Sequence, residues 1–223
     1  YDRARDDKFY KAHGPIALGI PVSGTWDDHD YWKDDSGGNY ACKMQSQNEF
    51  LRHFNVPTTD QRHFMHGENQ QKGIYSSHMF AVPDQQANGI HVINLDIRYH
   101  RTPTTSDKGP CEREHSDFLG ENQWTWLENE LNKNSELKII TSGVQVLPPT
   151  SQYMGVNESI CAYDGPGNTF DGNVTLLGEN SAFVAGKQKR QETWSEIPQA
   201  RARLLRLVQK YVNAGRMKKV FFL

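Results

Sequence analysis

Five aspartates and one histidine lie within ten residues near the start of the chain. They are Asp27, Asp28, His29, Asp30, Asp34 and Asp35, in the stretch T-W-D-D-H-D-Y and the four residues after it. Carboxylates packed so closely repel one another and resist ionisation unless cations are near. Bound metal ions reverse that penalty, and an imidazole flanked by carboxylates is stabilised in its cationic form, which suits proton donation to a leaving oxygen. The segment is therefore a candidate site for metal-assisted acid–base chemistry.

The same residues also fit a plainer interpretation. Aspartates are common in solvated loops, where their side chains bond to nearby backbone groups, and His29 could be a structural residue of such a loop. The residue types alone support both interpretations equally.

Two further pairs of polar residues follow predicted strands. Asp96 and Arg98 end an apolar run, where Arg98 could bind a phosphate oxygen bidentately; a buried ion pair between the two residues is the favoured alternative. Ser142 and Gln145 follow the next strand and could border a substrate pocket, with simple turn chemistry as the favoured alternative. Arg98 and Gln145 are therefore the candidate substrate-binding residues.

Apolar periodicity predicts the elements that must position these residues. Helices are expected where apolar residues recur at helical spacing, and strands where short apolar runs occur. The expected helices are 44–54, 119–131 and 198–215, and the expected strands are 90–97, 137–141 and 219–223, with a short β-leaning segment at 19–26. Residues 164–180, rich in Gly and Asn, are expected to form a long loop.

The order of these elements favours an α/β layered domain. Strands and helices alternate from residue 90 onward, which favours at least partly parallel pairing. In such sheets, ligands collect at the loops that follow the carboxyl ends of the strands. The sequence contains no visible internal repeat or linker, so residues 1–223 are expected to belong to a single domain.

Composition limits the classes of function. The formal net charge is -2 and the basic residues are scattered, which gives no basis for nucleic-acid binding. No apolar run approaches the ~20 residues that span a bilayer, so no transmembrane segment is expected. Three distant cysteines, Cys42, Cys111 and Cys161, fit neither a zinc site nor a dense disulfide framework. Glycosylation sequons at Asn157 and Asn173 slightly favour an extracellular or secretory location.

Residues 24–31, with the sequence G-T-W-D-D-H-D-Y, resemble the W-D-D-H-[DE] motif of phosphatases of the alkaline phosphatase D (PhoD-like) type. Five more stretches of the family pattern follow in order. They are G-I-Y at 73–75, L-D-I-R-Y-H-R at 95–101, L-G-E-N-Q-W-T-W-L at 119–127, I-I-T-S-G-V-Q at 139–145, and E-T-W at 192–194 with Pro198 and R-A-R-L-L at 201–205. Any one stretch would be a weak signal, but the six together extend over nearly the whole chain.

This resemblance implies the calcineurin-like metallophosphoesterase fold, an αββα sandwich in which two sheets are flanked by helices. It also implies hydrolysis of phosphomonoesters or phosphodiesters by a metal-bound hydroxide. His29 would then be the proton donor, with Asp30 orienting its ring. The candidate metal ligands would be Asp27, Asp28 and Asp34. The implied cofactors are two or more metal ions, which could include iron and calcium, and the implied partner is a phosphoester substrate.

The chain departs from the family pattern in two ways. Asp34 stands where the family has an Asn, which leaves open whether Asp28 or Asp34 reaches a metal. The family's upstream Asp segment and its downstream S-G-D-x-H motif, which supply further ligands, are not in this sequence. We therefore expect a domain that is incomplete at both ends and that alone binds metal weakly and catalyses poorly. The alternative is a catalytically inactive relative that serves as a binding or scaffold domain.

Overall fold

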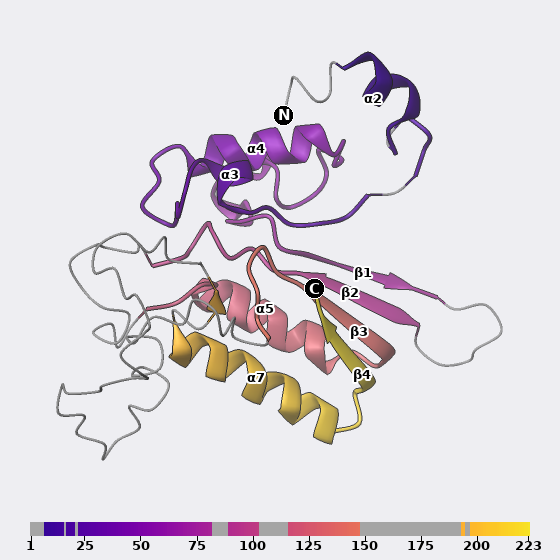
Figure 1. The fold of residues 1–223 in the computed structure, drawn as a ribbon, viewed down its shortest axis with the longest axis vertical. Helices are drawn as coiled ribbons and strands as arrows, with labels where there is room; N and C mark the ends of the chain where they lie inside the picture. Colours follow the sequence, from indigo (N-terminus) through magenta and orange to yellow (C-terminus); the bar gives the residue numbers. More distant parts are fainter. Residues whose placement is uncertain are drawn as a thin grey trace, which may run out of the picture.

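The computed structural model describes residues 7–15, 17–20, 22–81, 89–102, 116–147, 193–194 and 197–223. Within these residues the chain forms a mixed α/β fold around a four-stranded sheet with the order β1-β2-β3-β4 (Figure 1). The strands are β1 (Ser76–Phe80), β2 (Ile90–Asn94), β3 (Ser135–Thr141) and β4 (Met217–Phe222). β1 is antiparallel to β2, whereas β2, β3 and β4 run parallel.

Helices flank this sheet. The helices of the described residues are α2 (Lys8–His13), α3 (Asp28–Tyr31), α4 (Lys43–His53), α5 (Gly120–Asn132) and α7 (Pro198–Asn213), with a 3-10 helix, η1 (Phe64–Asn69); α2 lies away from the sheet. In Figure 1, α5 and α7 lie side by side on one side of the strands, and α3 and α4 are seen on the opposite side. None of the helices in the described part of the chain combines the length and the apolar composition needed to cross a bilayer.

The main core lies between the sheet and helices α5 and α7. Ile93 of β2 and Ile140 of β3 are fully buried in one cluster with Leu127 of α5 and Leu204 of α7. Each such side chain contributes roughly 1.5–3 kcal/mol relative to exposure. The helical spacing of apolar residues in α5 and α7 therefore matches the face that each helix presents to the sheet.

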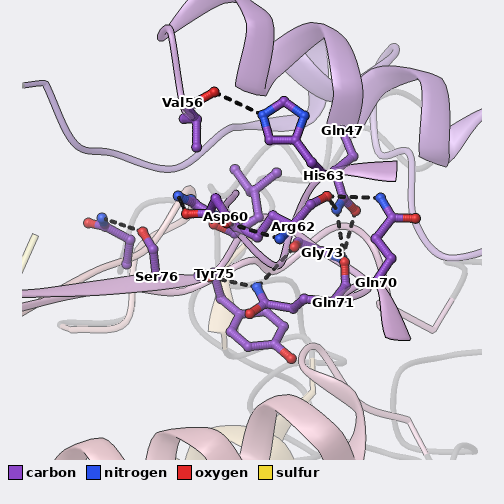
Figure 2. A network of polar contacts seen from close by, with 12 residues as sticks. Gln47, Val56, Asp60, Arg62, His63, Gln70, Gln71, Gly73, Tyr75 and Ser76 are labelled. Carbon is purple, nitrogen blue, oxygen red and sulfur yellow. Dashed lines mark hydrogen bonds and ion pairs between the residues drawn. The ribbon is translucent and has the colours of Figure 1, made fainter. Parts of the chain in front are cut away.

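α4 and the chain after it are joined by a network of polar contacts (Figure 2). Gln47 of α4 donates Nε2 to the carbonyl oxygen of Arg62 at 2.6 Å, and its Oε1 accepts from the Gly73 amide at 2.8 Å. Arg62 is paired with Asp60 at 2.8 Å and donates Nη1 to the carbonyl oxygen of Ile74 at 3.1 Å. The network fixes residues 60–74, whose last residues reach the candidate site.

The sequence-based elements from residue 44 onward are confirmed, with boundaries shifted by a few residues. The predicted helices correspond to α4, α5 and α7, the predicted strands to β2, β3 and β4, and the expected parallel pairing is present. β1 was not predicted. The predicted β-leaning segment at 19–26 contains no strand in its described residues.

The predicted α/β layering is confirmed: the described residues form one four-stranded mixed sheet with helices on both sides. The two-sheet sandwich implied by the family resemblance is a finer arrangement that this sheet alone does not establish. The predicted loop at 164–180, Cys111, Cys161 and both sequons lie outside the described residues, and Cys42 is an exposed free cysteine.

A buried polar cluster connects three strands to α5. Glu130 of α5 accepts hydrogen bonds from Ser77 Oγ at 2.8 Å and from Lys133 Nζ at 2.7 Å, and it lies 3.1 Å from His91 Nε2. Lys138, which is fully buried in β3, contacts His91 Nδ1 at 3.0 Å. Burial opposes ionisation of Glu130, but the hydrogen bonds from His91, Lys133 and Ser77 outweigh it and lower its pKa to about 2. Burial lowers the pKa of Lys138 to about 8.

The lowered pKa of Glu130 predicts that the fold is less stable in acid. Because its pKa is lower in the folded chain than its ordinary value of 4.5, the charged carboxylate stabilises the fold above pH 4.5, and that contribution is lost as the pH falls towards 2. Between pH 5 and pH 2 the free energy of unfolding should therefore fall by less in Glu130→Gln than in the wild type, the difference being on the order of 2–3 kcal/mol. Urea unfolding followed by circular dichroism at several pH values measures this. Glu68→Gln, at an exposed position, is the control, and its stability should fall with decreasing pH as that of the wild type does.

Candidate metal site

The acidic segment runs beside the chain that follows β2. Thr25 Oγ1 donates to the carbonyl oxygen of Leu95 at 2.5 Å, and the buried indole of Trp26 donates Nε1 to Asp96 Oδ1 at 2.8 Å. Gly143, in the loop after β3, approaches so closely that a Cβ added there would lie 2.4 Å from the carbonyl oxygen of Trp26. The segment therefore crosses the carboxyl ends of two parallel strands, where ligands bind in α/β sheets.

Asp96 is fully buried, and its carboxylate receives four hydrogen bonds. Oδ1 accepts from the Trp26 indole, from the Arg98 amide at 2.9 Å and from the Tyr99 amide at 3.0 Å, while Oδ2 accepts from the Ile74 amide at 2.8 Å. Asp96 is thus a structural acceptor that holds the acidic segment to the end of β2.

Asp27 is anchored by an ion pair with Arg98. The guanidinium of Arg98 is fully buried; its Nη2 donates to Asp27 Oδ1, and its Nη1 lies 3.4 Å from the carbonyl oxygen of Ser36. An ion pair involving Arg98 was the favoured alternative from the sequence, but its partner is Asp27, and Asp96 accepts instead from the Arg98 backbone. This placement favours an anchoring role for Arg98 over contact with a phosphate.

Asp28, His29 and Asp34 converge at the surface. One ligand atom from each of the three lies within 4.8 Å of the other two. His29 Nε2 is 2.5 Å from Asp34 Oδ1, and the two oxygens of Asp28 accept from the amides of His29 at 2.7 Å and Asp35 at 3.0 Å. The sequence left open whether Asp28 or Asp34 is the ligand; the structure brings both into one cluster.

Asp30, the residue expected to orient the His29 ring, forms a contact at the start of α3. Its Oδ2 accepts from the Asp27 amide at 3.2 Å, at the start of α3, while Asp34 makes the contact with the His29 ring. The hydrogen bond with Asp34 is the main cause that raises the pKa of His29, followed by the charge of Asp28. Asp34 is therefore the residue that orients His29 in this structure.

Ser142 and Gln145 lie in a turn that holds a buried tryptophan. Ser142 Oγ accepts from the indole of Trp194 at 2.9 Å, and the carbonyl oxygen of Gln145 accepts from the Trp194 amide at 3.1 Å. The Gln145 side chain is exposed, and its Nε2 lies 3.4 Å from the carbonyl oxygen of Leu147. These contacts favour the turn interpretation of both residues, and the structure does not bring Gln145 into the acidic cluster.

Two features of the turn after α3 were not expected from the sequence. Asp35 has a left-handed backbone, with φ of 58°, and its amide holds Asp28. The Gly38 amide donates to the carbonyl oxygen of Arg101 at 2.8 Å, and an added Cβ at Gly38 would lie 2.9 Å from that oxygen. The run D-S-G-G at 35–38 is the available signal, because Asp and Gly are the residues that favour such turns.

The cluster lies on an open surface. The side chain of His29 is 73% exposed and that of Asp34 is 59% exposed. Two cavities, of about 360 and 550 Å³, lie near residues 55–57, and none of the three cluster residues lines either of them. A ligand can therefore reach the cluster directly from solvent.

The chain matches no protein-family model, no curated protein and no solved structure. The assignment of the site consequently depends on its residues, on their geometry and on the motif resemblance.

The close approach of Gly143 to Trp26 predicts a sharp packing constraint. In Gly143→Ala, the added methyl group would meet the Trp26 carbonyl oxygen at 2.4 Å, so one of the two segments must move. We expect a loss of about 1–3 kcal/mol in the free energy of unfolding, measured by urea titration. Gly24→Ala is a matched control in the same segment, since no heavy atom lies within 4 Å of its added Cβ. Equal stability of the two variants would contradict the packing.

Proposed function

We propose that this chain is a PhoD-like metallophosphatase domain that hydrolyses phosphoesters with the aid of metal ions. The observation that carries the proposal is the convergence of Asp28, His29 and Asp34 from one short acidic segment beside the carboxyl ends of β2 and β3. The six motif stretches support the same assignment, and with it the two-sheet αββα arrangement.

The donor set is compatible with a metal ion. The carboxylates of Asp28 and Asp34 offer the oxygen ligands that several divalent and trivalent ions accept, and the imidazole of His29 lies within 4.8 Å of both. Asp28 and Asp34 would hold the ion, and its charge would relieve their mutual repulsion. When bound, a metal ion supplies Lewis-acid polarisation of the phosphate and activation of water. The family resemblance supports two or more ions, iron and calcium among them, so this cluster would form part of a larger centre.

His29 is the proposed proton donor to the leaving oxygen. Its ring is exposed to solvent, and Asp34 orients it through Nε2. The surrounding carboxylates raise its pKa, which favours the imidazolium form that can donate a proton. A cation held by Asp28 and Asp34 would lower the pKa of His29 again. The balance between the negative carboxylates and the positive ion would therefore set how readily His29 releases its proton.

Asp27 and Asp30 have positioning roles in this proposal. Asp27 is bound by the buried guanidinium of Arg98, and Asp30 accepts from the Asp27 amide at the start of α3. Both contacts fix the backbone that carries Asp28 and His29. Asp27 is therefore assigned to anchoring instead of metal ligation.

Metal binding should depend on Asp28 and Asp34. Asp28→Asn and Asp34→Asn each remove a negative charge and keep the size of the side chain, so each should weaken binding of Mn²⁺ or Ca²⁺ at least about tenfold. Isothermal titration calorimetry of the protein with each ion measures this. Asp35→Asn is the matched control, because its carboxylate is outside the cluster and Asn tolerates the left-handed backbone. If all three variants bind as the wild type does, the cluster is not a metal site.

Catalysis should depend on His29. His29→Ala should lower kcat for metal-dependent hydrolysis of phenyl phosphate by about two orders of magnitude or more, because the phenoxide is a poor leaving group that depends on general acid catalysis. His13→Ala, at an exposed position of α2, is the control and should keep the wild-type rate. Metal binding without any hydrolysis would favour the alternative of a binding or scaffold domain. Hydrolysis that persists in His29→Ala would remove His29 from the proposed chemistry.

A further inference from the structure

Trp32 is an exposed tryptophan inside the acidic segment. About half of its surface, 53%, is open to solvent, whereas Trp26, Trp124 and Trp194 are at most 2% exposed and Trp126 is partly buried. Exposing a large aromatic surface costs hydrophobic free energy that burial would recover. Trp32 therefore differs from the other four tryptophans, which are buried or pack against the core.

Trp32 lies in the same short segment of backbone as the candidate metal ligands. It follows α3, and its amide donates to the carbonyl oxygen of Asp28 at 2.6 Å. His29 precedes it by three residues, and Asp34 follows it by two. The turn that brings Asp34 back to His29 therefore also carries the Trp32 side chain.

A chain of aromatic rings fixes the Trp32 indole. Trp32 stacks on Tyr40 with ring centroids 4.8 Å apart and an interplanar angle of 16°. Tyr40 meets Tyr31 edge-to-face at 5.5 Å, and Tyr31 meets the buried Trp26 edge-to-face at 4.9 Å. The indole is thus packed at the end of a row of rings that reaches the core, and a side chain that is already packed loses less entropy on binding a ligand.

We propose that Trp32 is a specificity determinant that stacks on a flat aromatic leaving group. The preferred substrates would then be aryl or nucleoside phosphoesters, with the phosphate at the Asp28–His29–Asp34 cluster and the ring on the exposed indole. Stacking suits this position because every aromatic ring offers a π face and the indole is already held parallel to Tyr40. The phosphoester part of this inference rests on the proposed function, whereas the stacking part rests on Trp32 itself.

Equilibrium binding tests the stacking without requiring turnover. The indole N–H signals of the ¹⁵N-labelled, Mg²⁺-loaded protein would be followed by NMR during titration with AMP, phenyl phosphate or glycerol phosphate. The Trp32 signal, identified from its loss in Trp32→Leu, should shift with the two aromatic esters. In isothermal titration calorimetry with the same esters, Trp32→Leu should reduce the preference for aromatic over alkyl ester about tenfold, and Trp32→Phe should restore most of it. Phe64→Leu is the control, since Phe64 is 56% exposed and lies in η1.

Each outcome decides one of the two proposals. Equal shifts with AMP and phenyl phosphate support recognition of any aryl ring, while a shift with AMP alone narrows the class to nucleoside esters. Trp32-dependent binding without hydrolysis would uphold stacking and overturn the hydrolase proposal. If the protein hydrolyses phosphoesters and Trp32→Leu keeps the preference for aromatic esters, the hydrolase proposal is upheld and the stacking proposal is overturned. Glycerol phosphate that binds the wild type as tightly as AMP, or no binding of any ester, would overturn the stacking proposal.

Discussion

A buried carboxylate, that of Asp96, is the contact on which the arrangement of the site depends. Isolated in the interior, an ionised carboxylate would be very costly, but here four donors surround it: the Trp26 indole and the amides of Ile74, Arg98 and Tyr99. Loss of the carboxylate would leave these four buried donors without their acceptor, a penalty of about 1–3 kcal/mol for each. The acidic segment, the chain before β1 and the end of β2 therefore meet in one geometry.

Asp96 also joins the main core to a second core, which is the buried cluster of Trp26, Tyr31, Phe50, Leu51, Ile74 and Tyr99. Its backbone exchanges two hydrogen bonds with Gln123 of α5, at 2.8 and 2.7 Å, which connects it to the main core. On the other side, Gly73 has φ of 104°, and a Cβ there would lie 2.8 Å from Asp96 Oδ2, so only glycine fits. The amide of Gly73 is held by Gln47 of α4. A displacement in either core would thus be felt at the same carboxylate.

Local sequence patterns were sufficient for the parts of the fold that bury a continuous apolar face. α5 and α7 show helical periodicity, and β2 to β4 are short apolar runs, so their existence follows from composition and spacing. β1 is different, because S-S-H-M-F does not alternate and the strand lies at an edge of the sheet with three exposed residues. Its pairing with β2 is a tertiary property. Likewise, the described residues between 19 and 26 form no strand, and the segment is held by side-chain contacts such as Thr25 to Leu95.

The density of aspartates predicted a cluster near His29 but not the division of labour within it. Asp27 pairs with Arg98, which is 71 residues away in the sequence, and the left-handed backbone of Asp35 lies in the turn that brings Asp34 to the His29 ring. Neither contact can be derived from spacing alone. The consequence is electrostatic: the buried guanidinium balances the charge of Asp27, whereas Asp34 remains exposed beside the partly buried Asp28. These two carboxylates are the ones whose repulsion a cation would offset, which is why the metal assignment falls on them.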